Sequence, residues 1–190
     1  MASLGTLALG TYSNVSNTAI VGTEPVLNLI AAANDATYVN DSSNTTHTGT
    51  AQFALGDTPA DFSAMLTLSV QLRYFWESGT QTNTWGSLTA RVFRSDGTTP
   101  LTDEATLATG ITTTTPTNSS AVGFTGVDTA ADKSVWDAAV VRINFGITKV
   151  KGGDSLTERV SAAQITGTYT AVVAATKPVY VHHYKTMMET

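Results

Sequence analysis

The sequence predicts an all-β protein, either a jelly roll or a two-sheet antiparallel β-sandwich, with extended N- and C-terminal arms. Apolar and polar residues alternate with a period of two, which is typical of half-buried strands and is clearest over residues 66–76. No helical periodicity lasts longer than about two turns. Turn residues separate about eight strand candidates, and this spacing favours a sandwich over a repeat protein.

Three segments are expected along the chain. Residues 1–24 carry scattered apolar side chains and form either an N-terminal arm or an edge strand. Residues 25–175 form the β-sandwich domain, and a chain of 190 residues is long enough to bury a core of that size. Residues 176–190 form a C-terminal arm or a last strand.

The clearest strand, residues 66–76, is predicted to be central in its sheet. Leu68, Val70 and Leu72 share the face that we expect in the core. A polar segment follows, and then residues 88–92 alternate again. Two such runs around a short polar segment predict a hairpin.

A second hairpin is predicted near the end of the domain. Val141, Ile143 and Phe145 share one face, which we also expect in the core. A turn at 152–155 follows, and then a second extended run over 160–169, which together indicate antiparallel strands with one wet face.

Two local features accompany this hairpin. The parity of the second run slips between Ala162 and Ile165, which predicts a β-bulge. Asp132 to Ser134 predict the start of a helical turn, and Trp136 is expected in the core.

The composition argues against several partners. Charged residues make up 13% of the chain, the net charge is −5 and the pI is about 5.0, which disfavours nucleic acid and anionic membrane surfaces. There is no cysteine for disulfides or thiolate metal sites, no apolar run long enough for a membrane helix and no basic start of a secretory signal. The 35 threonines favour strands with a neutral surface, as in adhesins and virion proteins.

No catalytic site is predicted, and no metal or other cofactor. His47 is interpreted as a solvated loop residue, while His182 and His183 would point to opposite faces of a strand. No nucleophile elbow, P-loop, dinucleotide or zinc motif is present. The paired acids are interpreted as turn and surface residues: Asp57 with Asp61, Asp103 with Glu104, and Asp128 with Asp132. A structural Ca²⁺ in the segment from Asp35 to Asp41 stays open.

Aromatic residues flank the polar segment between the runs of the first hairpin. Tyr74, Trp76 and Trp85 are candidate glycan contacts, because aromatic faces at a loop end can stack on sugar rings. The alternative is that Trp76 and Trp85 close one end of the core.

Four blocks carry a resemblance to a known class: residues 135–143, Gly153-Asp154, residues 160–162 and Gly167 to Thr170. This pattern resembles the end of jelly-roll structural proteins of tailed bacteriophages, and residues 34–39 fit an early element of the same proteins. The resemblance covers residues 25–172 and implies a virion component on the phage particle surface. It implies a capsid decoration (cement) protein or a related head or tail module, with a homotrimer whose partner is the major capsid protein, and it supplies no catalytic residue.

The two arms then supply candidate capsid or oligomer contacts, because an extended arm gains order by adding strands to a neighbour. The candidates are Leu4, Leu7, Leu9, Tyr12, Val179, Tyr180, Val181 and Tyr184. The main hypothesis is therefore a non-enzymatic cement protein that stabilises contacts between capsid subunits. The alternatives are a sugar- or receptor-binding module of a phage head or tail fibre, and a hydrolase whose site the sequence does not reveal.

Overall fold

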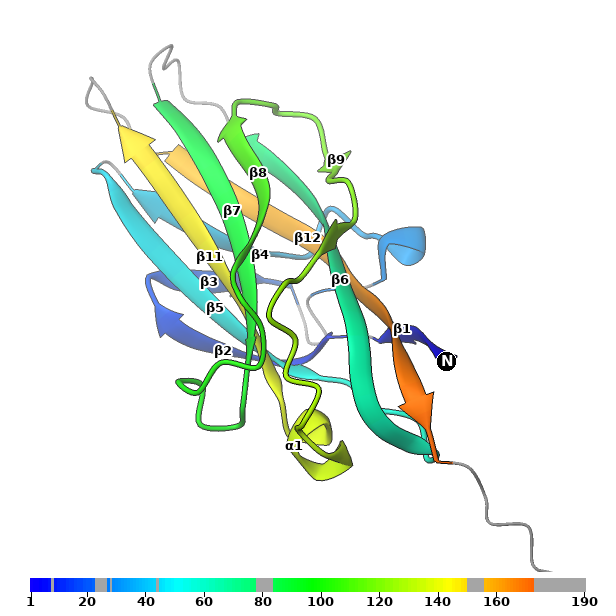
Figure 1. Cartoon of the computed structure of the whole chain (residues 1–190). Helices are drawn as coiled ribbons and strands as arrows, with labels where there is room; N and C mark the ends of the chain where they lie inside the picture. The colour runs from blue at the N-terminus through cyan, green and yellow to red at the C-terminus, as the bar shows by residue number, and fades with distance from the viewer. Residues whose placement is uncertain are drawn as a thin grey trace, which may run out of the picture.

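A computed structural model describes residues 1–7, 9–22, 27, 29–43, 45–77, 84–149 and 156–172. Of the residues that the structure describes, 62% are in strands and 5% in helices, which confirms the all-β prediction. Its strands form two antiparallel sheets that pack face to face as a β-sandwich (Figure 1).

One sheet is built around two long strands. β6 (Phe62–Glu77) and β12 (Leu156–Ala171) pair along most of their length. The other edge of β12 pairs first with β4 (Tyr38–Ser43) and further along with β1 (Ala2–Leu7). β3 (Thr18–Val21) pairs with β4. The strand predicted at 66–76 lies within β6, but the middle strand of this sheet is its neighbour β12.

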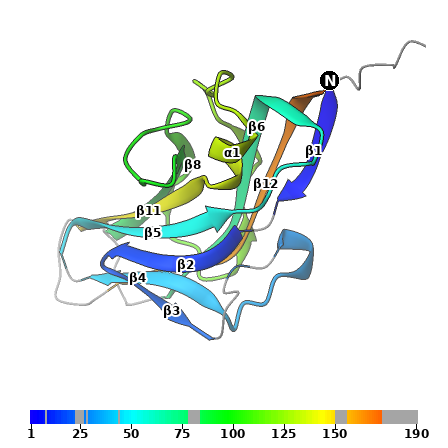
Figure 2. The ribbon, with the colours of Figure 1, turned by 90° about the horizontal axis from the view of Figure 1, so that it is seen from below.

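The second sheet has the order β2-β5-β11-β7-β8. These strands are β2 (Leu9–Ser16), β5 (His47–Leu55), β11 (Val140–Lys149), β7 (Thr84–Phe93) and β8 (Ala105–Ile111). β11 pairs with β5 on one side and with β7 on the other, so it is the central strand. Figure 2 shows the two sheets from below, with β5 and β11 in one layer and β6 and β12 in the other.

Short elements complete the sandwich. β9 (Thr117–Asn118) and β10 (Val122–Gly123) pair with β6, and a 3₁₀ turn, η1, spans Ile30–Ala32. The helix α1 (Lys133–Asp137) is capped by Asp132, whose side chain accepts a hydrogen bond from the Val135 N–H, so the predicted helical turn is confirmed. Within the described residues, no helix is long and apolar enough to span a membrane.

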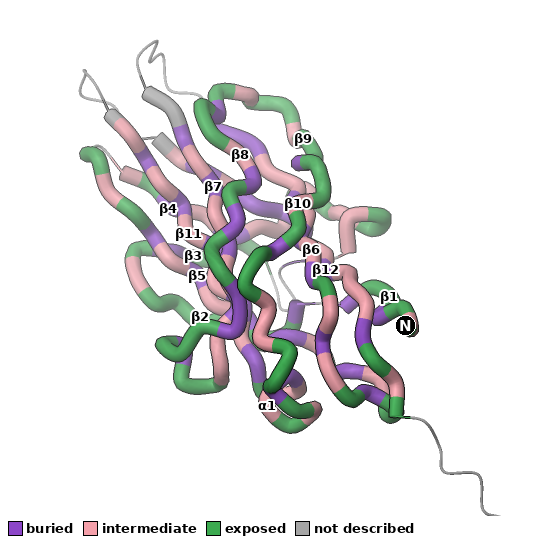
Figure 3. The backbone as a smooth tube through the Cα atoms, viewed as in Figure 1, coloured by how far each residue is buried: buried purple, intermediate pink, exposed green. Residues whose placement is uncertain are grey.

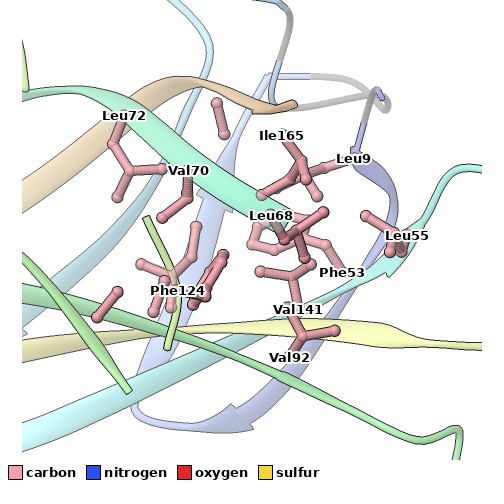
Figure 4. Packing of buried hydrophobic residues seen from close by; sticks show 14 of the residues in the cluster. Leu9, Phe53, Leu55, Leu68, Val70, Leu72, Val92, Phe124, Val141 and Ile165 are labelled. Carbon is pink, nitrogen blue, oxygen red and sulfur yellow. The ribbon is translucent and has the colours of Figure 1, made fainter. Parts of the chain in front are cut away.

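The core fills the space between the sheets. All six side chains predicted to face it are at most 1% exposed: Leu68, Val70, Leu72, Val141, Ile143 and Phe145. Figure 4 shows Leu68 of β6 close to Val141 of β11, so the two sheets interdigitate there. Trp136 is fully buried, as predicted.

Both predicted hairpins are wrong. β6 lies in the seven-stranded sheet and β7 in the five-stranded sheet, and the same change of sheet separates β11 from β12. The physical reason is that alternation reports which face of a strand is apolar and not which sheet contains the strand. Every strand of a sandwich turns one apolar face to the same core, so successive strands look like hairpin partners even when they belong to opposite layers.

The predicted bulge exists but lies earlier in β12. The register of β12 against β6 shifts between Val160 and Ala162, and Ser161 is the extra residue. Val160, Ala163 and Ile165 all reach the core because of this shift.

Residues 2–21 form edge strands in both sheets and not a free arm. Leu4, Leu7 and Leu9 are only 5%, 8% and 2% exposed and belong to the hydrophobic core of this chain. Tyr12 is half-buried, with its ring centroid 5.8 Å from that of Phe53. The remaining arm candidates and two histidines lie outside the described residues: Val179, Tyr180, Val181, Tyr184, His182 and His183.

Candidate functional site

The two described side chains of the predicted aromatic site, Tyr74 and Trp76, pack on the core. Trp76 is 5% exposed and belongs to the core, and Tyr74 is half-buried against the same core. The structure therefore supports the core interpretation for Trp76 over a glycan contact. Trp85 lies on β7 opposite Thr148, and its side chain lies outside the described part of the structure.

Most of the acids that were interpreted as turn and surface residues have hydrogen-bond or ion-pair partners among the described residues. Asp132 caps α1, and Asp128 forms an ion pair with Arg94 at 3.3 Å. Asp61 accepts a hydrogen bond from the Tyr169 hydroxyl at 2.7 Å, and Asp103 accepts one from the Thr125 hydroxyl at 3.1 Å. The open hollow on the five-stranded sheet, which is described below, is not lined by two of these carboxylates.

The segment proposed for Ca²⁺ is divided between two environments. Asp35 binds the Arg73 guanidinium through both carboxylate oxygens and accepts the Ser161 hydroxyl, and the Arg73 hydrogen bond lowers its pKa. Asp41 is buried. Over the described ranges, no group of three His, Cys, Asp or Glu side chains is arranged to hold a metal ion.

A cluster of titratable side chains lies between the sheets. Asp41 of β4 and Glu158 of β12 stand directly opposite each other, and both are 0% exposed. His47, at the start of β5 in the other sheet, donates from Nε2 to Asp41 Oδ2 at 2.7 Å. His47 therefore bridges the sheets with 22% of its side chain exposed, and its interpretation as a solvated loop residue is wrong.

Burial dominates the protonation of this acidic pair. It raises the pKa of Glu158 well above the ordinary value, and the Asp41 charge raises it further. Burial also raises the pKa of Asp41, against the opposing effects of His47 and of the N–H groups of Ser42 and Gly49. Asp41 Oδ1 and both Glu158 oxygens lack a hydrogen-bond partner. Both acids are enclosed, so the cluster offers no carboxylate oxygen to a ligand on the surface.

Two glycines of the five-stranded sheet make room for the acids. A Cβ on Gly86 would lie 2.6 Å from Glu158 Oε1 and 2.8 Å from the Trp76 ring. A Cβ on Gly49 would lie 2.6 Å from Asp41 Oδ2. Sequence reasoning missed this cluster, although Glu158 has the parity of buried Val160 and was therefore a charge on an apolar face.

The outer face of the five-stranded sheet gathers polar side chains from three adjacent strands. Buried and half-buried residues alternate along β11, and Figure 3 shows this alternation on the tube. On the wet face, Asn144 lies between Thr50 of β5 and Thr89 of β7. In the next row, Gly146 lies between Thr48 and Ser87.

An open hollow of about 350 Å³ lies over these rows. Its lining residues are Thr48, Ser87, Thr89, Glu104, Asn144 and Gly146. Gly146 leaves space at the bottom of the hollow, where a Cβ would clash with Ser87 Oγ. The lining contains no aliphatic, aromatic or basic side chain, so the hollow presents hydroxyl, amide and carboxylate groups.

Asn144 is held at the centre of this hollow. Its Oδ1 accepts from the Thr50 hydroxyl at 2.9 Å, and its Nδ2 donates to Thr89 Oγ1 at 3.2 Å and to Glu104 Oε2 at 3.4 Å. These contacts come from β5, β7 and the segment before β8, so three parts of the sheet fix one amide. In the sequence, the alternation along β11 places Asn144 on the polar face of the strand. Its neighbours follow only from the pairing of β11 with β5 and β7.

Comparisons with known proteins give structural neighbours only. No protein-family model and no curated protein matches the chain. The module TmCBM61, solved with β-1,4-galactotriose, is 9% identical with a TM-score of 0.40, and the match covers 83% of this chain and 88% of that one. A family 30 carbohydrate-binding module of a Clostridium thermocellum cellulosomal cellulase is 12% identical with a TM-score of 0.35, covering 88% of this chain and 98% of that one.

A third neighbour is a Clostridium thermocellum xylanase fragment that joins a carbohydrate-binding module to a GH10 module and was solved with xylohexaose. It is 16% identical with a TM-score of 0.44, and the match covers 93% of this chain but 30% of that one. The identities and TM-scores are low, so no ligand and no residue role is transferred from these proteins to this chain.

Proposed function

We propose that this protein is a non-catalytic glycan-binding module whose binding surface is the outer face of the five-stranded sheet. The observation that carries the proposal is the polar hollow centred on Asn144. Ligand sites are typically concave and have a few polar groups that fix orientation. The hollow has both properties, and its position on three paired strands makes it rigid.

The lining chemistry fits a ligand rich in hydroxyl groups. A hydroxyl both donates and accepts, so it matches the mixed donors and acceptors of an amide, a carboxylate and several hydroxyls. A lipid or an apolar peptide would need apolar lining that this hollow lacks. The hydrogen bonds that hold Asn144 arrange these groups before a ligand binds, which lowers the ordering cost of binding.

Binding without hydrolysis follows from the single carboxylate in the hollow. Glycosidases place two carboxyl groups about 5–10 Å apart across the scissile bond. Glu104 is the sole acid among the described residues that line the hollow. It is therefore assigned to accept hydrogen bonds from sugar hydroxyls.

The test is binding of the full chain to a panel of soluble oligosaccharides by isothermal titration calorimetry. Asn144→Ala should weaken the best ligand by about tenfold or more, because it removes hydrogen bonds and leaves their partners unpaired. The matched control is Gln164→Ala, an amide on the outer face of the other sheet that donates to Gln71 at 3.1 Å. The proposal fails if no oligosaccharide binds the folded protein, or if Asn144→Ala binds as well as the control.

The virion setting, the homotrimer and the capsid partner stay predictions. The cement hypothesis loses one of its supports, because the apolar residues of the N-terminal segment belong to the core. A glycan-binding module on a phage head or tail fibre is compatible with both the resemblance and the hollow. Binding to undecorated heads, followed by heating of bare and decorated particles, would restore the cement hypothesis if decoration raised their heat resistance.

A further inference from the structure

Two arginines stand directly opposite each other beside the hollow. In the register of β11 and β7, Arg142 faces Arg91, one row away from the pair of Asn144 and Thr89. Like charges in directly opposite positions destabilise an antiparallel pair. A guanidinium keeps its proton in proteins, so both side chains stay charged.

Neutral contacts hold both side chains in place. Arg91 donates from Nε to the Thr102 carbonyl at 2.8 Å, and Arg142 donates from Nε to Gln52 Oε1 at 2.9 Å. Both guanidinium groups lie near the Phe93 ring, 5.5 Å and 5.1 Å from its centroid. These contacts orient the two cations and neutralise neither.

Neither arginine has a carboxylate partner among the described residues. Elsewhere, Arg73 forms an ion pair with Asp35, and Arg94 forms one with Asp128. The ion pairs found between described residues include neither Arg91 nor Arg142. In a chain of net charge −5, two adjacent cations without an ion-pair partner make a local site of positive charge that favours an anion.

We propose that Arg91 and Arg142 form an acid-binding site beside the hollow and that the ligand is an acidic glycan, with a uronate carboxylate on the two guanidinium groups. This proposal rests on the proposed glycan-binding function. A planar guanidinium matches the two oxygens of a carboxylate, and a carboxylate between the arginines replaces their repulsion by two attractive contacts.

The hollow and the adjoining arginine row differ in charge in a way that fits such a ligand. Successive rows on one face of a sheet are about 7 Å apart, so the arginine row adjoins the Asn144 row. Glu104 lines the hollow and would repel a second negative group there. The acid group therefore binds at the arginines, while neutral hydroxyl groups of the next sugar unit bind around Asn144.

The turn that contains Gly97 packs against the Arg142 guanidinium. A Cβ on Gly97 would lie 2.5 Å from Arg142 Nη2 and 2.8 Å from Gln52 Oε1, so the backbone of this turn lies against the guanidinium. Gly97 has φ +67 and donates its N–H to the Arg94 carbonyl at 2.8 Å. Only glycine combines this backbone conformation with such close approach without strain.

The experiment compares three oligosaccharides of equal length by calorimetry on the full chain: a neutral one, one with uronate units and one with sulfate esters. The wild type should bind the uronate ligand about tenfold or more tightly than the neutral one, and added salt should reduce this preference. Arg91→Gln and Arg142→Gln should each remove most of the preference and leave neutral-ligand affinity within about twofold. Arg142→Lys should retain part of it, because lysine keeps the charge but not the fork.

The matched control is Arg159→Gln on the other sheet. Arg159 also stacks on aromatic rings, 4.3 Å from the Tyr38 centroid and 5.5 Å from the Phe75 centroid, so it tests general loss of charge and stacking. Equal binding of neutral and uronate ligands, or equal effects of Arg142→Gln and Arg159→Gln, overturns the acid site while the glycan function stands. Preference for sulfate over uronate overturns the carboxylate assignment, and failure of all three ligands to bind overturns both proposals.

Discussion

Two pairs of like charges face each other across neighbouring strands, and they sit in opposite surroundings. Asp41 and Glu158 pair within the seven-stranded sheet and are completely buried. Arg91 and Arg142 pair within the five-stranded sheet and are half-exposed on its outer face. Both pairs stand directly opposite each other on antiparallel strands, so they differ in burial and in the kind of charged group.

The acids relieve their repulsion by holding a proton, which burial and mutual repulsion both favour. The arginines stay charged, and the contacts described for them are an aromatic ring and neutral hydrogen-bond acceptors. The comparison teaches that a buried pair of like charges acts on the stability of the fold, whereas an exposed pair that cannot titrate stays ready for a counter-ion.

Filling the space beside Glu158 should have the largest effect on the free energy of unfolding. Gly86→Val puts side-chain atoms where Glu158 Oε1 and the Trp76 ring already lie, so the free energy of unfolding should fall by about 3 kcal/mol. Denaturant unfolding followed by tryptophan fluorescence measures the change. Gly123→Val on β10 is the control, because its nearest obstacle is Ser69 Oγ at 3.9 Å. Equal losses in the two variants would show that the space around Glu158 is not tight.

Removing one acid should stabilise the fold. Glu158→Met keeps a similar length and removes a buried carboxyl group without hydrogen-bond partners, so we expect a gain of about 1–3 kcal/mol at pH 8. The gain should be smaller at pH 5, where the wild-type carboxyl group is protonated. Thermal unfolding at both pH values checks this, with exposed Glu104→Met as the control. A loss of stability at pH 8 would contradict the assignment of Glu158 as an unfavourable buried group.

The wild-type protein should become less stable as the pH rises. Asp41 and Glu158 have raised pKa values, so the folded chain keeps protons that the unfolded chain releases above the ordinary carboxyl pKa. The free energy of unfolding therefore falls as the pH rises from that point toward the raised values. Chemical denaturation at pH 5, 7 and 9 tests the sign. A flat profile between pH 5 and 9 would mean that the pair is not buried in solution.

The acids at the surface set the opposite limit. Asp35, Asp96, Asp132 and Asp137 have lowered pKa values from hydrogen bonds or ion pairs, so their contributions are lost as the pH falls through those values. Maximal stability should thus lie at mildly acidic pH.

The exposed pair should have the smallest effect on stability. Arg91→Gln removes the repulsion from Arg142 together with a bond to the Thr102 carbonyl, so the free energy of unfolding should change by less than about 1 kcal/mol. Thermal unfolding at low and high salt measures it, and the wild type should gain more from added salt than the variant does. A loss of several kcal/mol would make Arg91 a structural residue and not a ligand-binding one.

Local patterns in the sequence were enough for the fold class but not for the strand pairing. The alternation around Leu68 and the capping position of Asp132 depend on nearby residues, and both predictions are confirmed. The partner of a strand depends on the whole chain. Residues 88–92 therefore seemed to pair with 66–76, whereas they pair with β11 and β8 in the other sheet.

The candidate site shows the same limit. The alternation of Val141, Ile143 and Phe145 places Arg142 and Asn144 on the polar face of one strand. Thr89 and Arg91 join them through a register that the sequence does not state. The mistaken hairpin prediction paired residues 88–92 with 66–76, so it placed Thr89 and Arg91 away from Asn144 and Arg142. The buried acids had a local signal in their parity, while their glycine neighbours Gly49 and Gly86 come from the opposite sheet.

The change of sheet between successive strands has a consequence for how the chain folds. β12 pairs with β6, β4 and β1, and Ala2 of β1 is opposite Tyr169 of β12. The seven-stranded sheet cannot close until β12 has been synthesised, so β1, β4 and β6 emerge from the ribosome with unpaired edges. Because most pairings join distant segments, folding should be slow for a chain of this size, on a timescale of about milliseconds to seconds. Exposed strand edges during that interval make chaperone binding and aggregation compete with folding.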